Sequence, residues 1–142
     1  MRLTSNVSNA INYTDLLTAI PDLRAFTTNY HSTNWMAEIL HVEKHSLRRL
    51  HIIYTRFEQC DHFDFNELLA FIRKQRTAFD LIVTLFVANC DSFFLQLKQF
   101  LDQRLISARI LGNTKRTNVT INYNFVGYTW YVPLNEDILE LD

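Results

Sequence analysis

Glycine is almost missing from this chain. Its 142 residues include two glycines, Gly112 and Gly127, and the first 111 residues contain none. Phosphate-binding loops need glycine, because their backbone N–H groups approach the anion closely and often at positive φ. A P-loop requires two glycines within eight residues, and a dinucleotide-binding fingerprint requires three within six. The sequence contains neither motif. Their absence disfavours the common classes of nucleotide-dependent enzyme.

Length and composition indicate one ordinary globular domain. The hydrophobic share is 48% and the charged share is 20%, which is typical of chains that bury a core. We expect a single domain over residues 1–142, with a loose polar arm at 1–12 and an acidic tail at 134–142. The tail carries Glu136, Asp137, Glu140 and Asp142, and the rest of the chain has 14 basic against 11 acidic residues.

The cysteines and the apolar segments indicate the compartment. Cys60 and Cys90 are too few for a disulfide scaffold, and we expect two reduced thiols, buried or partly buried, rather than one structural disulfide. The N-terminus lacks the apolar stretch of a signal peptide. The longest apolar run, at 81–88, is too short to cross a bilayer. The sequence therefore predicts a cytoplasmic protein.

The middle of the chain gives the clearest pattern. Asp64 with Glu67 three residues later predicts a helix start, and apolar residues then follow at helical spacing. The run at 81–88 is apolar on both faces, which is typical of a strand that is covered on both sides. Asp91 is expected to cap a further helix. Shorter elements are predicted as a helix at 15–20 and a strand at 105–111.

Residues 35–58 admit two interpretations. One is a single long helix, and the other is a hairpin with arms at 35–42 and 49–57. The second arm is rich in β-branched and aromatic residues, and we favour the hairpin.

The best hairpin follows near the C-terminus, where the apolar period is two. Its alternating apolar residues are Val119, Ile121, Tyr123 and Phe125, then, after Gly127, Tyr128, Trp130 and Val132. We expect an α+β fold: a mixed, mainly antiparallel sheet with helices mostly on one face and a C-terminal β-hairpin.

Several polar clusters suggest chemistry. Histidines lie at His31, His41, His45, His51 and His62, and a metal-dependent hydrolase is one hypothesis. However, the zinc-hydrolase motif needs Glu after its first His, and Val42 follows His41. No cofactor, metal site or catalytic residue is predicted, and we regard an enzyme as the less favoured class.

The strongest polar signal is a basic stripe within residues 44–56. Its members are Lys44, Arg48, Arg49 and Arg56. Aromatic residues on neighbouring strands would allow bases to stack beside such a stripe. A nucleic-acid-binding domain is therefore the alternative hypothesis.

Our leading hypothesis is a non-catalytic protein–protein interaction or assembly domain, such as an adaptor, an immunity or inhibitor protein, or a phage or virion component. Tyr and Trp anchor many interfaces, and the last hairpin is expected near a sheet edge that can pair with another chain. We expect Tyr123, Tyr128 and Trp130 to contact another protein or a second copy of the chain in a homo-oligomer, and no membrane.

Overall fold

The apolar segment at 81–88 lies at the centre of the sheet in the computed structural model, which describes residues 2–5, 11–29, 31–112 and 114–134. It forms β4 (Asp80–Leu85), whose Leu81 and Val83 are completely buried. β4 pairs with a parallel strand on each side, β3 (Arg49–Tyr54) and β6 (Asn118–Tyr123). The prediction of a strand in this segment is confirmed, although β4 ends at Leu85.

The sheet has seven strands in the order β1-β2-β3-β4-β6-β7-β5, and the first five in that order are parallel. Its remaining strands are β1 (Arg2–Ser5), β2 (Ala25–Thr28), β5 (Ile106–Ser107) and β7 (Val126–Tyr131). The expected α+β class with a mainly antiparallel sheet is therefore wrong. The chain is a single α/β domain, mostly parallel, ending in the antiparallel hairpin β6–β7, because helices between strands supply the crossovers that parallel pairing needs.

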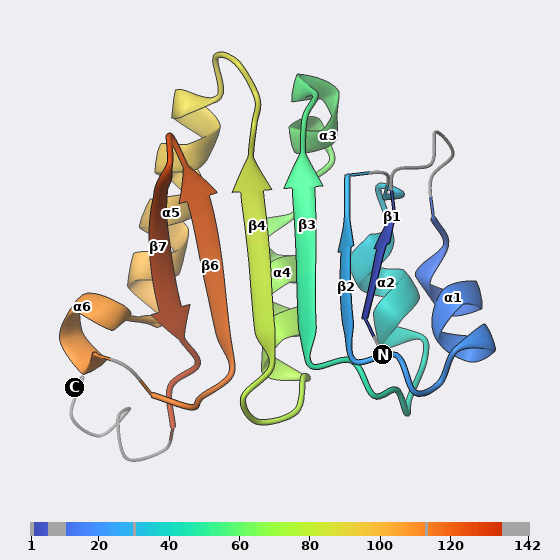
Figure 1. Cartoon of the computed structure of the whole chain (residues 1–142). Helices are drawn as coiled ribbons and strands as arrows, with labels where there is room; N and C mark the ends of the chain where they lie inside the picture. Colours follow the sequence, from blue (N-terminus) through green and yellow to red (C-terminus); the bar gives the residue numbers. More distant parts are fainter. Residues whose placement is uncertain (1, 6–10, 30, 113, 135–142) are drawn as a thin grey trace.

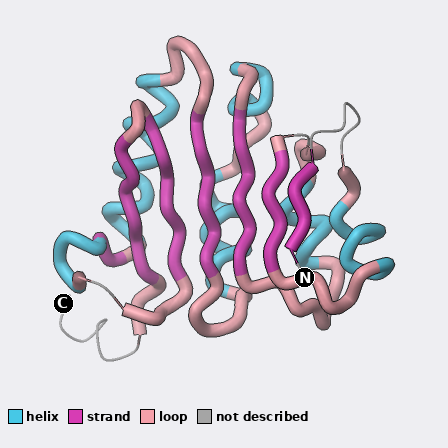
Figure 2. Tube along the Cα trace, in the orientation of Figure 1, coloured by secondary structure: helices cyan, strands magenta, loops and turns pink. Residues whose placement is uncertain are grey.

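The helices lie on one face of this sheet. They are α1 (Tyr13–Ala19), α2 (Trp35–Leu40), α3 (Phe57–Asp61), α4 (Phe65–Arg73), α5 (Asp91–Arg104) and α6 (Ala108–Leu111). Figure 1 shows α2, α4 and α5 behind the sheet, and no described helix crosses the face toward the viewer, as the trace in Figure 2 also shows. Each parallel strand is added beside the one before it, so right-handed crossovers bring every connecting helix to the same side.

The two faces of the sheet differ in chemistry because strand side chains alternate between them. The covered face carries the core, including Leu50, Ile52, Leu81, Val83 and Ile121, all with no exposed surface. The opposite face, here called the open face, carries mainly polar side chains on its three central strands: Arg49, His51, Ile53, Asp80, Ile82, Thr84, Asn118, Thr120 and Asn122. The expectation that the strand at 81–88 is covered on both sides is wrong, whereas the expectation of helices mostly on one face is confirmed (Figure 1).

Residues 35–58 form neither of the two expected structures. Trp35, Met36 and Ile39 are buried on the short helix α2, and a loop leads from it to β3. The second predicted arm is a strand, as expected, but β3 pairs in parallel with β2 and β4 rather than with residues 35–42. The six residues of α2 are too few for their apolar pattern to distinguish a short helix from a strand.

Several smaller expectations are confirmed or corrected. Asp64 caps α4, since its Oδ1 accepts hydrogen bonds from the backbone N–H groups of Asn66 at 2.9 Å and Glu67 at 3.1 Å. Residues 105–111 form the two-residue strand β5 and the helix α6 instead of one strand. Within the predicted loose arm, residues 2–5 form β1, whereas 6–10 and the tail from 135 onward lie outside the described residues.

Candidate functional site

A polar network crosses the open face near the carboxyl ends of the central strands. The Nε2 atom of His51 on β3 lies 2.7 Å from Thr84 Oγ1 on β4. Asn122 on β6 donates from Nδ2 to the same hydroxyl oxygen at 3.1 Å. Nearer the amino ends, Asn118 Nδ2 donates to Asp80 Oδ1 at 2.6 Å. His51, Thr84 and Asn122 therefore form a hydrogen-bonded row, and Asn118 and Asp80 a separate pair, on a face that no described helix covers.

Two exposed phenylalanines stand beside this network. Phe86 directly follows β4 and is 59% exposed, and Phe125 follows β6 and is 99% exposed. Both line a groove of about 330 Å³ whose floor includes His51, Thr84 and Asn122. We call Phe86, Phe125 and this groove the tip surface.

The backbone at Phe125 is unusual for a residue of its size. Asn124 and Phe125 have φ values of 50° and 62° and form the two-residue turn between β6 and β7. Such turns favour Asn followed by Gly, because bulky side chains at positive φ cost about 1–2 kcal/mol. The sequence alternation predicts Phe125 on the core face, and this is wrong. Because the ring is almost fully exposed, burial of the side chain does not offset the cost of this backbone conformation.

The hairpin residues predicted to bind a partner lie on the covered face. The Tyr123 ring stacks on Phe94 of α5 with centroids 4.3 Å apart. Trp130 is 2% exposed, and its Nε1 donates to Asp102 Oδ1 at 2.8 Å. Tyr128 is half-buried beside Phe94. Packing against α5 is therefore the first role of these three side chains, and partner binding by them stays a prediction.

Within the described residues, four of the six residues of β7 have no strand paired on their outer side. β5 pairs with Trp130 and Tyr131 only. Residues flanking a two-residue turn bond to each other, so Gly127 and Thr129 direct their backbone groups away from β6. A groove of about 410 Å³ lies along this edge, between β7, α5 and α6, and Tyr128 is among its lining residues. The hairpin thus combines an exposed tip with a partly open edge.

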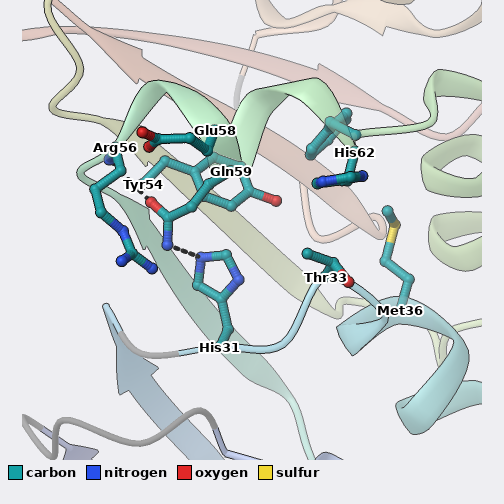
Figure 3. A pocket seen from close by; sticks show the side chains of 9 residues that line it. His31, Thr33, Met36, Tyr54, Arg56, Glu58, Gln59 and His62 are labelled. Atoms are coloured by element: carbon teal, nitrogen blue, oxygen red, sulfur yellow. Dashed lines mark hydrogen bonds between the residues drawn. The ribbon is translucent and has the colours of Figure 1, made fainter.

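A second pocket, of about 190 Å³, lies at the carboxyl ends of β2 and β3 (Figure 3). His31 points into it, and its Nε2 lies 3.4 Å from Gln59 Nε2. Burial lowers the pKa of His31, and the neighbouring Arg56 charge lowers it further. His62 and Tyr54 also line the pocket. A neutral imidazole held between polar groups is suited to hydrogen bonding.

The histidines are too dispersed to support the metal hypothesis. His31 and His62 line the pocket just described, His41 ends α2, and His51 lies on the open face. Nowhere in the described ranges do three His, Cys, Asp or Glu residues gather closely enough to hold a metal ion. The structure gives no observation in favour of a metal-dependent hydrolase.

Both cysteines are buried and unpaired with each other. Burial raises the pKa of the Cys60 thiol to about 11, with the nearby Cys90 and Asp61 adding to the effect. Burial also raises the pKa of Cys90. A thiol is nucleophilic as its thiolate, and these environments disfavour that form. The expectation of two buried thiols is confirmed.

The predicted basic stripe is divided between opposite ends of the sheet. Lys44, Arg48 and Arg49 lie before or at the start of β3, whereas Arg56 follows its carboxyl end. A six-residue strand separates the two groups by roughly 20 Å. Arg56 therefore belongs with the His31 pocket, and the other three join basic residues from further loops.

Comparison of the chain with models of known protein families, with curated proteins and with solved structures found no match. Among the helices that the structure describes, none has the length and hydropathy needed to cross a bilayer.

Proposed function

We propose that this chain is a non-catalytic protein–protein interaction domain, and that it contacts its partner through the tip surface of the C-terminal hairpin. In the simplest case the partner is a second copy of the chain. The observation that carries the proposal is Phe125, whose ring is 99% exposed at a φ of 62°. A strained residue that the fold does not bury points to a role outside the fold.

The surroundings of Phe125 suit protein recognition. Interfaces typically place an aromatic anchor among polar groups that form a rim. Here Phe86 and Phe125 supply apolar surface, and the His51–Thr84–Asn122 row supplies hydrogen-bonding groups within the same groove. The open edge of β7 lies on the same hairpin and offers backbone groups for strand pairing.

Sedimentation velocity over a concentration series tests self-association. Phe125→Gly and Phe125→Ala should each weaken it at least tenfold, because both remove the anchoring ring. Leu95→Gln is the matched control, since Leu95 is 54% exposed on α5 and does not line the groove of the tip surface. It should leave association unchanged. Equal effects of all three variants would contradict a specific contact through the tip.

A wild-type chain that stays monomeric at every concentration would exclude self-association. The same variants then test a different protein partner, by capture from the native source followed by mass spectrometry. The proposal expects a protein that is retained by the wild type and by Leu95→Gln and lost with both Phe125 variants. Retention of every captured protein by those two variants would exclude the tip surface as the contact.

A further inference from the structure

The loops at the amino ends of the parallel strands carry a strong excess of positive charge. Residues 20–24, 41–49, 74–80 and 114–118 contain eight basic residues and three acidic ones. At the opposite end, residues 31–34, 55–64, 86–91 and 124–125 contain Arg56 and four carboxylates. The domain is therefore electrically polarised along its strands.

Seven exposed cations define what we call the amino-end surface. Arg116 already has an interaction partner, and it is not included. The members are Arg24, Lys44, Arg48, Arg49, Lys74, Arg76 and Lys115. Within the described residues none of these seven forms an ion pair.

The helix dipole explains only one member of this surface. Cations are favoured in the last turn of a helix, where the carbonyl groups are unpaired. The last turns of α1 and α2 contain no basic residue, and those of α4 and α5 contain Arg73 and Arg104, which are not members of the surface. Lys74 is the C-cap residue of α4, where the dipole favours a cation, whereas the other six cations lie outside the last turns of the helices.

Backbone hydrogen bonds hold the loops of this surface in a row. The N–H groups of Arg48 and Arg49 both donate to Arg24 O, at 2.8 and 3.1 Å. The N–H of Asp80 donates to Arg48 O at 2.8 Å. These bonds join the starts of β2, β3 and β4, which are neighbouring strands about 4.8 Å apart.

Arg76 continues the row toward β6. Its carbonyl accepts a hydrogen bond from Thr117 Oγ1 at 2.7 Å, and its Nη2 donates to His45 O at 3.2 Å. Arg48 and Arg76 line one shallow groove of about 510 Å³. The loops that carry these cations are therefore joined by hydrogen bonds in a row across four neighbouring strands, β2, β3, β4 and β6.

We propose that the amino-end surface binds the phosphate backbone of nucleic acid, independently of base sequence. A linear array of cations matches the repeating charge of a phosphate chain, and the arginine fork suits phosphate oxygens. The surface exposes no Phe, Tyr or Trp side chain for base stacking, because its one such residue, Phe79, is buried, and His41 is its one exposed ring. It also has no exposed large apolar side chain, the anchor that an acidic protein partner would be expected to use.

Fluorescence anisotropy with a labelled single-stranded oligonucleotide of about 16 nucleotides tests the proposal. Four phosphate contacts predict that affinity falls about 50-fold between roughly 50 and 200 mM salt. The double variant Arg48→Ala/Lys115→Ala removes two contacts and should reduce that change to about 7-fold. Neither side chain makes a hydrogen bond within the described residues, so the fold should persist, and circular dichroism checks this.

Arg56→Ala is the matched control, because it removes one positive charge at the other end of the sheet. It should leave the affinity within about twofold of the wild type. Absence of binding at low salt would overturn the proposal, and so would an Arg56→Ala effect as large as that of the double variant. Equal binding of poly-glutamate of similar total charge would also overturn it, by indicating an acidic protein partner. None of these outcomes depends on the tip surface.

Discussion

His51 and Thr84 lie on neighbouring strands of the open face, with Nε2 of the imidazole 2.7 Å from the hydroxyl oxygen. Burial lowers the pKa of His51, and the adjacent charge of Arg49 lowers it further. The folded chain therefore favours the neutral imidazole. The same holds for His31 and His45, whose pKa values are lowered first by burial.

These three histidines predict that stability falls in mild acid. A depressed pKa means that the unfolded chain binds more protons than the folded chain between the folded pKa and about 6.5. The free energy of unfolding should be constant above about pH 7 and decrease below about pH 6.5. Thermal melts followed by circular dichroism from about pH 7.5 to 5 measure this, and His51→Gln should reduce the slope. A melting temperature that rises on acidification would contradict it.

Tyr54→Phe is expected to destabilise the core. Trp35 Nε1 donates to Tyr54 Oη at 3.0 Å, and the two residues are 1% and 2% exposed. The variant leaves the indole N–H without this acceptor, at a cost of about 1–2 kcal/mol in the free energy of unfolding. Urea denaturation provides the measurement. Tyr128→Phe on β7 is the control and should change stability by less than about 0.5 kcal/mol.

Phe125→Gly should stabilise the fold while it removes the proposed anchor. Glycine adopts positive φ without steric cost, although it also gains entropy in the unfolded chain. The net gain is expected to be about 0.5–1 kcal/mol, or about 3 °C in melting temperature. Phe125→Ala keeps the strained backbone and should melt close to the wild type. Equal melting temperatures for the two variants would show that the turn stores no strain.

Cys60 and Cys90 should react slowly with thiol reagents in the folded protein. Both are buried, and burial raises the pKa of Cys60 to about 11. At neutral pH each thiol therefore reacts mainly when the chain opens. Labelling with an aromatic disulfide reagent should be complete within seconds in denaturant and orders of magnitude slower without it. Rapid labelling of one folded thiol would contradict its burial.

Part of the fold could be predicted from local patterns. Asp64 and the apolar run at 81–88 have strong, short-range signals, and the elements that they predict are confirmed. Strand direction was not predictable in this way, because alternation identifies the face of a side chain and not the neighbour of its strand. The four-residue strand β2 (Ala25–Thr28) is too short to show a clear period, so the sequence pattern does not predict it.

The candidate sites, too, were predictable only where local sequence patterns define them. The hairpin was predicted, but its alternation could not reveal that α5 covers Tyr123 and Trp130. The signal for the tip was present in Asn124, a favoured turn residue, although the glycine at 127 suggested a later turn. The basic residues near β3 were noted, yet their grouping with Arg24, Arg76 and Lys115 depends on contacts between loops far apart in the chain.

The spatial order of β1 to β4 repeats their order along the chain, and this has a kinetic consequence. Each strand–helix unit rests on its immediate predecessor and successor, as the units of a solenoid do. Local unfolding should therefore start at the edge strand β1 and proceed through β2 and β3 toward β4, one strand–helix unit at a time. Amide hydrogens are then expected to exchange progressively more slowly from β2 to β4, so that the molecule opens from one side and not as a whole.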